Sequence, residues 1–71
     1  MMVLELHEHD TNTGPFSQIK DIKFVHEADM WVDETSRNLR AHRWVLKDGN
    51  RVVKVWERSS GPTGTPVVIG P

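Results

Sequence analysis

The clearest local pattern in the chain is an Asp48-Gly49 pair that separates two short runs rich in hydrophobic residues. Asp-Gly tolerates the positive φ angles that a two-residue hairpin loop requires. β-Branched and aromatic residues flank the pair on both sides, as is typical of paired strands. The pattern predicts a hairpin in which residues 39–47 pair with residues 50–57.

The segment from residue 20 to residue 33 fits two patterns. A helix would gather four apolar residues on one side, namely Ile22, Val25, Ala28 and Val32. It would leave Phe24, Met30 and Trp31 pointing elsewhere. A strand would place six alternate residues on one face, and all of them except His26 are apolar: Ile22, Phe24, His26, Ala28, Met30 and Val32. Because period two accounts for more of the apolar residues than the helical period does, we predict one long strand over residues 20–33, with a bulge near His26–Ala28.

The residues Glu34–Arg37 (ETSR) are expected to close a second hairpin between this long strand and residues 39–47. In the register that keeps apolar residues together, Trp31 lies opposite Arg40. The neighbouring pairs on that face are expected to be Asp29 with His42 and Glu27 with Trp44. Such pairs would be stabilised by cation–π contact and by opposite charge.

Two shorter segments complete the predicted sheet. Residues 2–9 alternate between apolar and polar side chains and indicate an N-terminal strand. Residues 59–66 have the Gly, Pro, Ser and Thr composition of a linker, and the β-prone residues Val67, Val68 and Ile69 follow. We therefore divide the chain into a small β domain, residues 1–58, and a tail, residues 59–71, that can add a short terminal strand.

Apolar residues dominate one face of the predicted sheet near the ETSR turn and the other face near the Asp48-Gly49 turn. A flat sheet cannot bury both faces, whereas a coiled sheet, a small barrel or a dimer of two sheets can. We therefore expect an all-β or mainly β fold: a four- to five-stranded antiparallel meander coiled into a small barrel-like sheet that can include one short helical turn.

Composition narrows the setting of the protein. The chain of 71 residues has no cysteine, so no disulfide can stabilise it. No apolar run approaches the roughly 20 residues that a membrane span needs, and the N-terminus lacks a signal-peptide pattern. We expect a cytoplasmic protein without membrane contact, of a composition that suits a bacterial or phage accessory protein. Small domains often need a metal or a partner subunit for stability.

The net charge of −1 hides an asymmetry between two parts of the chain. Residues 1–36 hold eight acidic and two basic residues, whereas residues 37–58 hold seven basic and two acidic ones. A basic hairpin with interleaved aromatic residues suits nucleic-acid binding. The residues that would carry this alternative function are Arg37, Arg40, Arg43, Lys47, Arg51 and Lys54. A net charge near zero favours internal neutralisation instead, so nucleic acid is the less favoured partner.

The histidines are weak candidates for a metal site. His7 and His9 share a strand face at a usable ligand spacing, and His42 or His26, with Glu8 or Asp10, could complete a site. No cysteine supports them and no metal-binding motif includes them, so we expect neither a metal nor another cofactor. No nucleophile elbow or phosphate-binding loop appears, and we expect a protein that is not an enzyme.

The remaining interpretation is a protein-interaction module that forms a homo-oligomer or binds a protein partner. Aromatic residues and arginine are the anchors that protein interfaces use most. We expect the contact to consist of a patch formed by Trp31, Arg40 and Trp44. The terminal segment Val67, Val68 and Ile69 is expected to add a strand to the sheet of the partner.

Overall fold

The computed structural model describes residues 1–60 and 64–71 and contains five strands and one helix. The strands are β1 (Met2–His7), β2 (Phe16–Ile22), β3 (Arg43–Asp48), β4 (Arg51–Arg58) and β5 (Pro66–Gly70). The helix α1 (Val25–Thr35) lies between β2 and β3 in the chain. Residues 61–63 of the expected linker lie outside the described residues.

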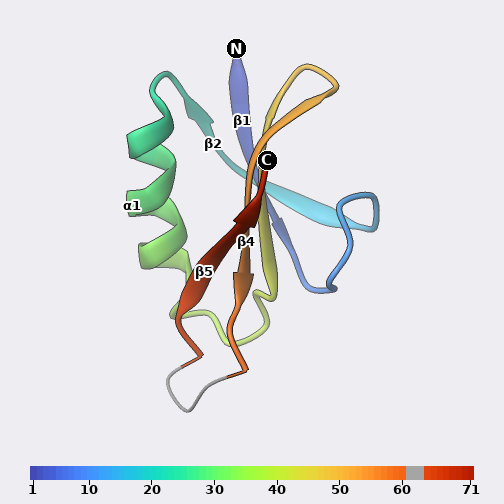
Figure 1. Ribbon diagram of the computed structural model, residues 1–71, viewed down its shortest axis with the longest axis vertical. Helices are drawn as coiled ribbons and strands as arrows, with labels where there is room; N and C mark the ends of the chain where they lie inside the picture. Colours follow the sequence, from blue (N-terminus) through green and yellow to red (C-terminus); the bar gives the residue numbers. More distant parts are fainter. Residues whose placement is uncertain (61–63) are drawn as a thin grey trace.

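All neighbouring strands are antiparallel and form one sheet in the order β2-β1-β3-β4-β5. The predicted mainly β class with four to five antiparallel strands is therefore confirmed. The sheet is open, because in the described residues β2 and β5 form its two edges and do not pair with each other. The single helix, which has 11 residues, packs beside one face of the sheet (Figure 1).

The hairpin around Asp48-Gly49 is confirmed. The strands β3 and β4 pair with Asp48 opposite Arg51, so Gly49 and Asn50 form the two-residue loop. Gly49 has a φ of 61°, a left-handed conformation in which the Cβ of other residues causes strain. The hairpin begins later than predicted, because residues 39–42 precede β3.

The long strand predicted for residues 20–33 is wrong, and with it the second hairpin at residues 34–37. Residues 25–35 form α1, and only Ala28 and Val32 of this helix are buried. Phe24 and Met30 remain 60% and 68% exposed. The period-two argument failed because it counted these two exposed apolar side chains as members of the core.

Local hydrogen bonds explain where α1 begins and ends. The Glu27 carboxylate accepts a hydrogen bond from the Phe24 backbone N–H at 3.1 Å, which satisfies one of the free donors of the first turn. At the other end the Thr35 hydroxyl donates to the Trp31 carbonyl and accepts a hydrogen bond from the Trp44 indole N–H at 2.8 Å. The second of these bonds ties the last turn of the helix to the sheet.

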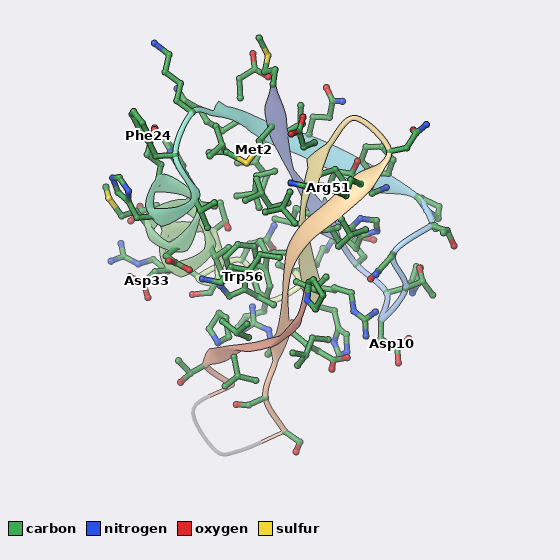
Figure 2. All side chains as sticks on the ribbon, turned by 45° about the horizontal axis from the view of Figure 1, so that its top comes forward. Met2, Asp10, Phe24, Asp33, Arg51 and Trp56 are labelled. Atoms are coloured by element: carbon green, nitrogen blue, oxygen red, sulfur yellow. The ribbon has the colours of Figure 1, made fainter. Side chains whose placement is uncertain are left out.

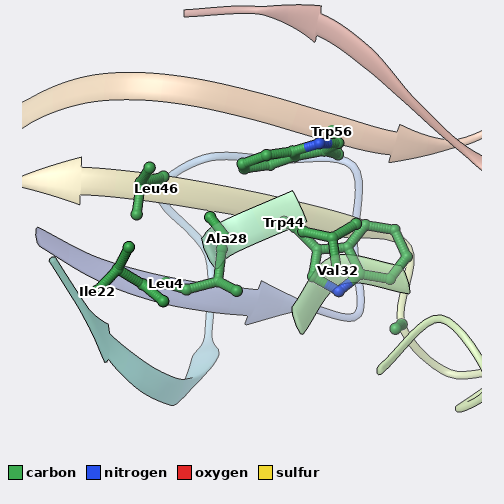
Figure 3. Packing of buried hydrophobic residues seen from close by; sticks show 8 residues of the cluster. Leu4, Ile22, Ala28, Val32, Trp44, Leu46 and Trp56 are labelled. Atoms are coloured by element: carbon green, nitrogen blue, oxygen red, sulfur yellow. The ribbon is translucent and has the colours of Figure 1, made fainter. Parts of the chain in front are cut away.

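The core lies between α1 and the face of the sheet that the helix covers (Figure 3). Ala28 and Val32 face the sheet, where Trp44 and Trp56 pack beside them. The complete set of buried residues in this cluster is Leu4, Ile22, Ala28, Val32, Ala41, Trp44, Leu46 and Trp56. The helix thus supplies the second layer that the sequence pattern assigned to a coiled or closed sheet.

Candidate functional site

The face of the sheet opposite α1 carries buried charged residues. Alternation along β1 directs Leu4 toward the core and Glu5 and His7 to this second face, where Glu5 is 5% and His7 0% exposed. The Glu5 carboxylate contacts His7 Nε2 at 3.1 Å and Lys47 Nζ at 3.2 Å. Its charge is therefore compensated inside the protein, as a buried carboxylate requires.

The segment between β1 and β2 closes over these charges. Arg43 Nη1 donates to the Asn12 side-chain oxygen at 2.8 Å, and Arg43 Nη2 donates to Glu57 Oε1 at 3.2 Å. Lys47 Nζ also donates to the Asn12 carbonyl at 3.4 Å. These bonds hold the loop after β1 against β3, and Figure 2 shows that Asp10 in this loop lies on the opposite side of the sheet from α1.

The same face brings together three potential metal ligands. Asp10 comes from the loop after β1, His42 from the residue before β3, and Glu57 from β4. One ligand atom from each lies within 4.8 Å of the other two. A hollow of about 510 Å³ adjoins this group and is lined by His42, Glu57, Arg58, Ser59, Ser60 and Val67.

Of the expected histidine candidates, only His42 belongs to this group. His7 is buried against Glu5, and His9 lies exposed beyond the end of β1, so the two do not share a strand face as predicted. Glu57 was missed in the sequence, although the correct hairpin register places it opposite Arg43. That register could have pointed to Glu57, but the approach of Asp10 depends on the fold of the loop after β1.

The patch expected from Trp31, Arg40 and Trp44 is not formed. Trp44 is fully buried, whereas Arg40 lies exposed in the loop after α1. In the described part of the chain no cation–π contact joins Arg40 to a tryptophan; Lys20 lies over Trp31 and Arg58 over Trp44. The predicted pairing failed because it required residues 27–33 to be extended, and they are helical.

The basic residues of segment 37–58 make many contacts within the chain. Arg43 and Lys47 bind Glu57 and Glu5 as described, and Lys54 Nζ lies 3.0 Å from Asp29 Oδ1. Arg58 donates to the backbone carbonyls of Ser36, Asn38, Ala41 and Gly64. Asp29 was predicted to lie opposite His42 and instead pairs with Lys54.

The other three basic residues are at the surface. Arg37 Nη1 lies 3.8 Å from Glu34 Oε1. Arg40 is exposed in the loop before β3, and Arg51 is exposed at the start of β4. The six residues predicted to bind nucleic acid therefore do not line one continuous strand face. Four of the seven basic residues of the segment, counting Arg58, hold the fold together.

The C-terminal residues form the edge strand β5, which pairs with β4 alone. Val67, Val68 and Ile69 are 46%, 57% and 47% exposed. On the α1 side, Val68 lines a hollow together with Val32, Trp56 and Pro66, and the acidic residues Asp29 and Asp33 lie at the same hollow. Figure 1 shows β5 crossing in front of β4.

Comparisons with protein-family models, with curated proteins and with solved structures each found no match to this chain. Among the described residues, α1 is too short to cross a membrane and no other helix occurs.

Proposed function

We propose that the protein is a small interaction module that self-associates by antiparallel pairing of β5 with β5 of a second copy. The observation that carries this proposal is the contrast between the two edges of the sheet. An edge strand presents unpaired backbone N–H and C=O groups to any other strand of matching length. Natural proteins usually block such edges with charges, prolines or irregular pairing.

The β2 edge has these protective features. Lys20 and Asp21 lie within the strand. Both edge strands have a register shift in their pairing, between Leu4 and Glu5 on the β1 side and between Val55 and Trp56 on the β4 side, so the charges are what distinguishes the β2 edge. By contrast, β5 carries no charged residue. Pro66 and Pro71 lack a backbone N–H and limit a further pairing to the four residues between them.

The side chains of β5 also suit a protein contact. Because successive residues of a strand point to opposite faces, the exposed residues Val67, Val68 and Ile69 place apolar surface on both sides of the edge. A second strand would cover this surface while it satisfies the backbone groups. Strand addition of this kind is a recurrent mode of protein recognition.

A second copy is the occupant that the chemistry of β5 favours. Two identical strands that pair antiparallel are related by a two-fold axis, which gives a closed dimer in which both edges are covered. An uncharged strand also meets its own copy without repulsion, whereas a charged one would face its own charge. We place the two-fold axis near Val68, the central residue of β5.

Light scattering after gel filtration tests the proposal. The wild-type protein should show twice the chain mass of 8.2 kDa at micromolar to millimolar concentration. Val68→Lys should be monomeric, because two ammonium groups would meet at the axis. The matched control Ser17→Lys places the same charge on the β2 edge and should remain dimeric.

A mixture of Val68→Lys with Val68→Glu provides the sharper test. The two variants should be monomeric alone and form a mixed dimer when combined, because opposite charges then meet at the axis. A wild-type protein that stays monomeric at millimolar concentration would contradict self-association. A Val68→Lys variant that stays dimeric would place the interface elsewhere.

A further inference from the structure

Three polar side chains gather on the face opposite α1 and belong neither to the hydrophobic core nor to β5. Asp10, His42 and Glu57 come from three separate segments, and their ligand atoms lie within 4.8 Å of one another. We propose that these residues bind a divalent first-row transition cation, with Zn²⁺ and Mn²⁺ as representative ions.

The fold holds two of the three ligands in fixed positions. The His42 backbone N–H donates to the His7 carbonyl at 2.9 Å, and the His42 carbonyl accepts from the Arg58 N–H at 2.9 Å. These two bonds hold the His42 backbone between the end of β1 and the end of β4. Glu57 lies within β4, opposite Arg43 in the ladder, so its backbone is part of the sheet.

The third ligand is positioned by its loop. Asp10 precedes Asn12 by two residues, and both Arg43 and Lys47 donate hydrogen bonds to Asn12. The Asp10 carboxylate itself makes no hydrogen bond or ion pair within the described part of the chain. It therefore remains available to a ligand from outside the protein.

The charges of the group favour an added cation. Two carboxylates, those of Asp10 and Glu57, lie close together and repel each other when both are ionised. Glu57 Oε1 is shared by Arg43 at 3.2 Å and His42 at 3.7 Å. Both of these contacts use Oε1, so Glu57 can bind a metal through Oε2 and keep its contact with Arg43.

The donor set selects the class of ion. An imidazole nitrogen with two carboxylates suits borderline cations such as Zn²⁺ and Fe²⁺, and the two carboxylates also suit the harder Mn²⁺. Calcium and magnesium prefer sets made of oxygen alone. Three protein ligands leave at least one coordination position open, and the adjoining hollow lined by Ser59, Ser60 and Val67 has room for water or a small anionic ligand there.

Two measurements on the full chain at neutral pH test the site. Isothermal titration calorimetry with Zn²⁺ gives the affinity of the wild type and its variants. Asp10→Asn and His42→Gln should each weaken binding by about tenfold or more, since even outer-shell partners of a metal typically contribute that much. The matched control His9→Gln removes an exposed histidine near Asp10 in sequence and should leave the affinity within about twofold of the wild-type value.

Paramagnetic broadening by Mn²⁺ in a ¹H–¹⁵N NMR spectrum locates the bound ion. The amide signals of Asp10, His42 and Glu57 and their neighbours should broaden first, while those of α1 remain sharp. Neither Asp10→Asn nor His42→Gln removes a contact that the core needs, so both variants should keep the wild-type spectrum without metal. Broadening centred on another acidic region, or an unchanged Zn²⁺ affinity in Asp10→Asn, would overturn the proposal.

Discussion

Arg58 is the residue whose removal should reveal most about the stability of this fold. It lies near the end of β4, and its guanidinium donates to the carbonyls of Ala41, Gly64, Ser36 and Asn38 at distances of 2.8 to 3.1 Å. The same group lies over the Trp44 ring at 5.6 Å. One side chain thus joins the loop after α1, the loop before β5 and the core.

The cost of the substitution Arg58→Ala follows from these contacts. A hydrogen bond to a charged group contributes about 1.5–3 kcal/mol, and a typical net bond about 1 kcal/mol. Arg58 is partly exposed, and its Nη2 is shared between the carbonyls of Ser36 and Asn38. We therefore count three independent bonds and assign to each the typical net value of about 1 kcal/mol. The free energy of unfolding should fall by about 3 kcal/mol.

This loss is large for so small a domain. A stability of about 0.05–0.15 kcal/mol per residue corresponds to roughly 4–10 kcal/mol for the whole chain. A loss of about 3 kcal/mol should lower Tm by about 12–24 °C. Arg58→Lys keeps the charge but lacks the planar fork that reaches several carbonyls, and it should lose about 2 kcal/mol.

Guanidinium chloride denaturation followed by tryptophan fluorescence measures these changes. Arg51→Ala is the matched control, because Arg51 is exposed beside the β3–β4 turn; its effect should stay within about 0.5 kcal/mol. If Arg58→Ala proves too unstable to fold, Arg58→Lys still provides the measurement. An unfolding free energy for either Arg58 variant within about 0.5 kcal/mol of the Arg51→Ala value would refute the reasoning.

Three further predictions concern the turn and the core. Gly49→Ala should destabilise the protein by about 1 kcal/mol or more in thermal unfolding, because the φ of 61° strains a Cβ. Gly70→Ala should have less effect, because both glycines have open space around the added Cβ but Gly70 does not have a positive φ. Asp29→Ala should cost about 1–2 kcal/mol in chemical denaturation, because Trp56 Nε1 loses its acceptor at 3.1 Å; an unchanged stability would show that water replaces it. Trp44→Phe should cost about 1–3 kcal/mol by the same assay, because a buried indole and its hydrogen bond to α1 are lost. A Trp44→Phe variant that loses the dimer but keeps the stability of the wild type would contradict the core position of Trp44.

The local sequence carried enough information for the central hairpin and for β1. At Asp48-Gly49 the residues themselves favour a turn, and the flanking β-branched residues favour extended chain on both sides. Strand pairing there joins segments that are neighbours in the chain, so no distant part of the protein has to be known. The same holds for the alternating residues Met2–His7, which form β1.

The candidate cation site was only partly predictable. The sequence suggested His42 or His26 with Glu8 or Asp10 as ligands, and it directed attention equally to His7 and His9. His7 is the last residue of β1 and its ring is buried. Asp10 follows in the loop after β1, which Arg43 holds through Asn12. No property of neighbouring residues determines which of the histidines meets Glu57.

The sequence by itself determined the β class, the central turn and the balance of charge, since these depend on local conformational preference and on composition. Only the tertiary structure decided that residues 25–35 are helical and which acids meet the basic residues. The physical reason is that α1 becomes stable by burying Ala28 and Val32 against Trp44 and Trp56, residues that come next to it only when the sheet has formed. Burial of a shared face, rather than the pattern within the segment, selected the helix over the strand.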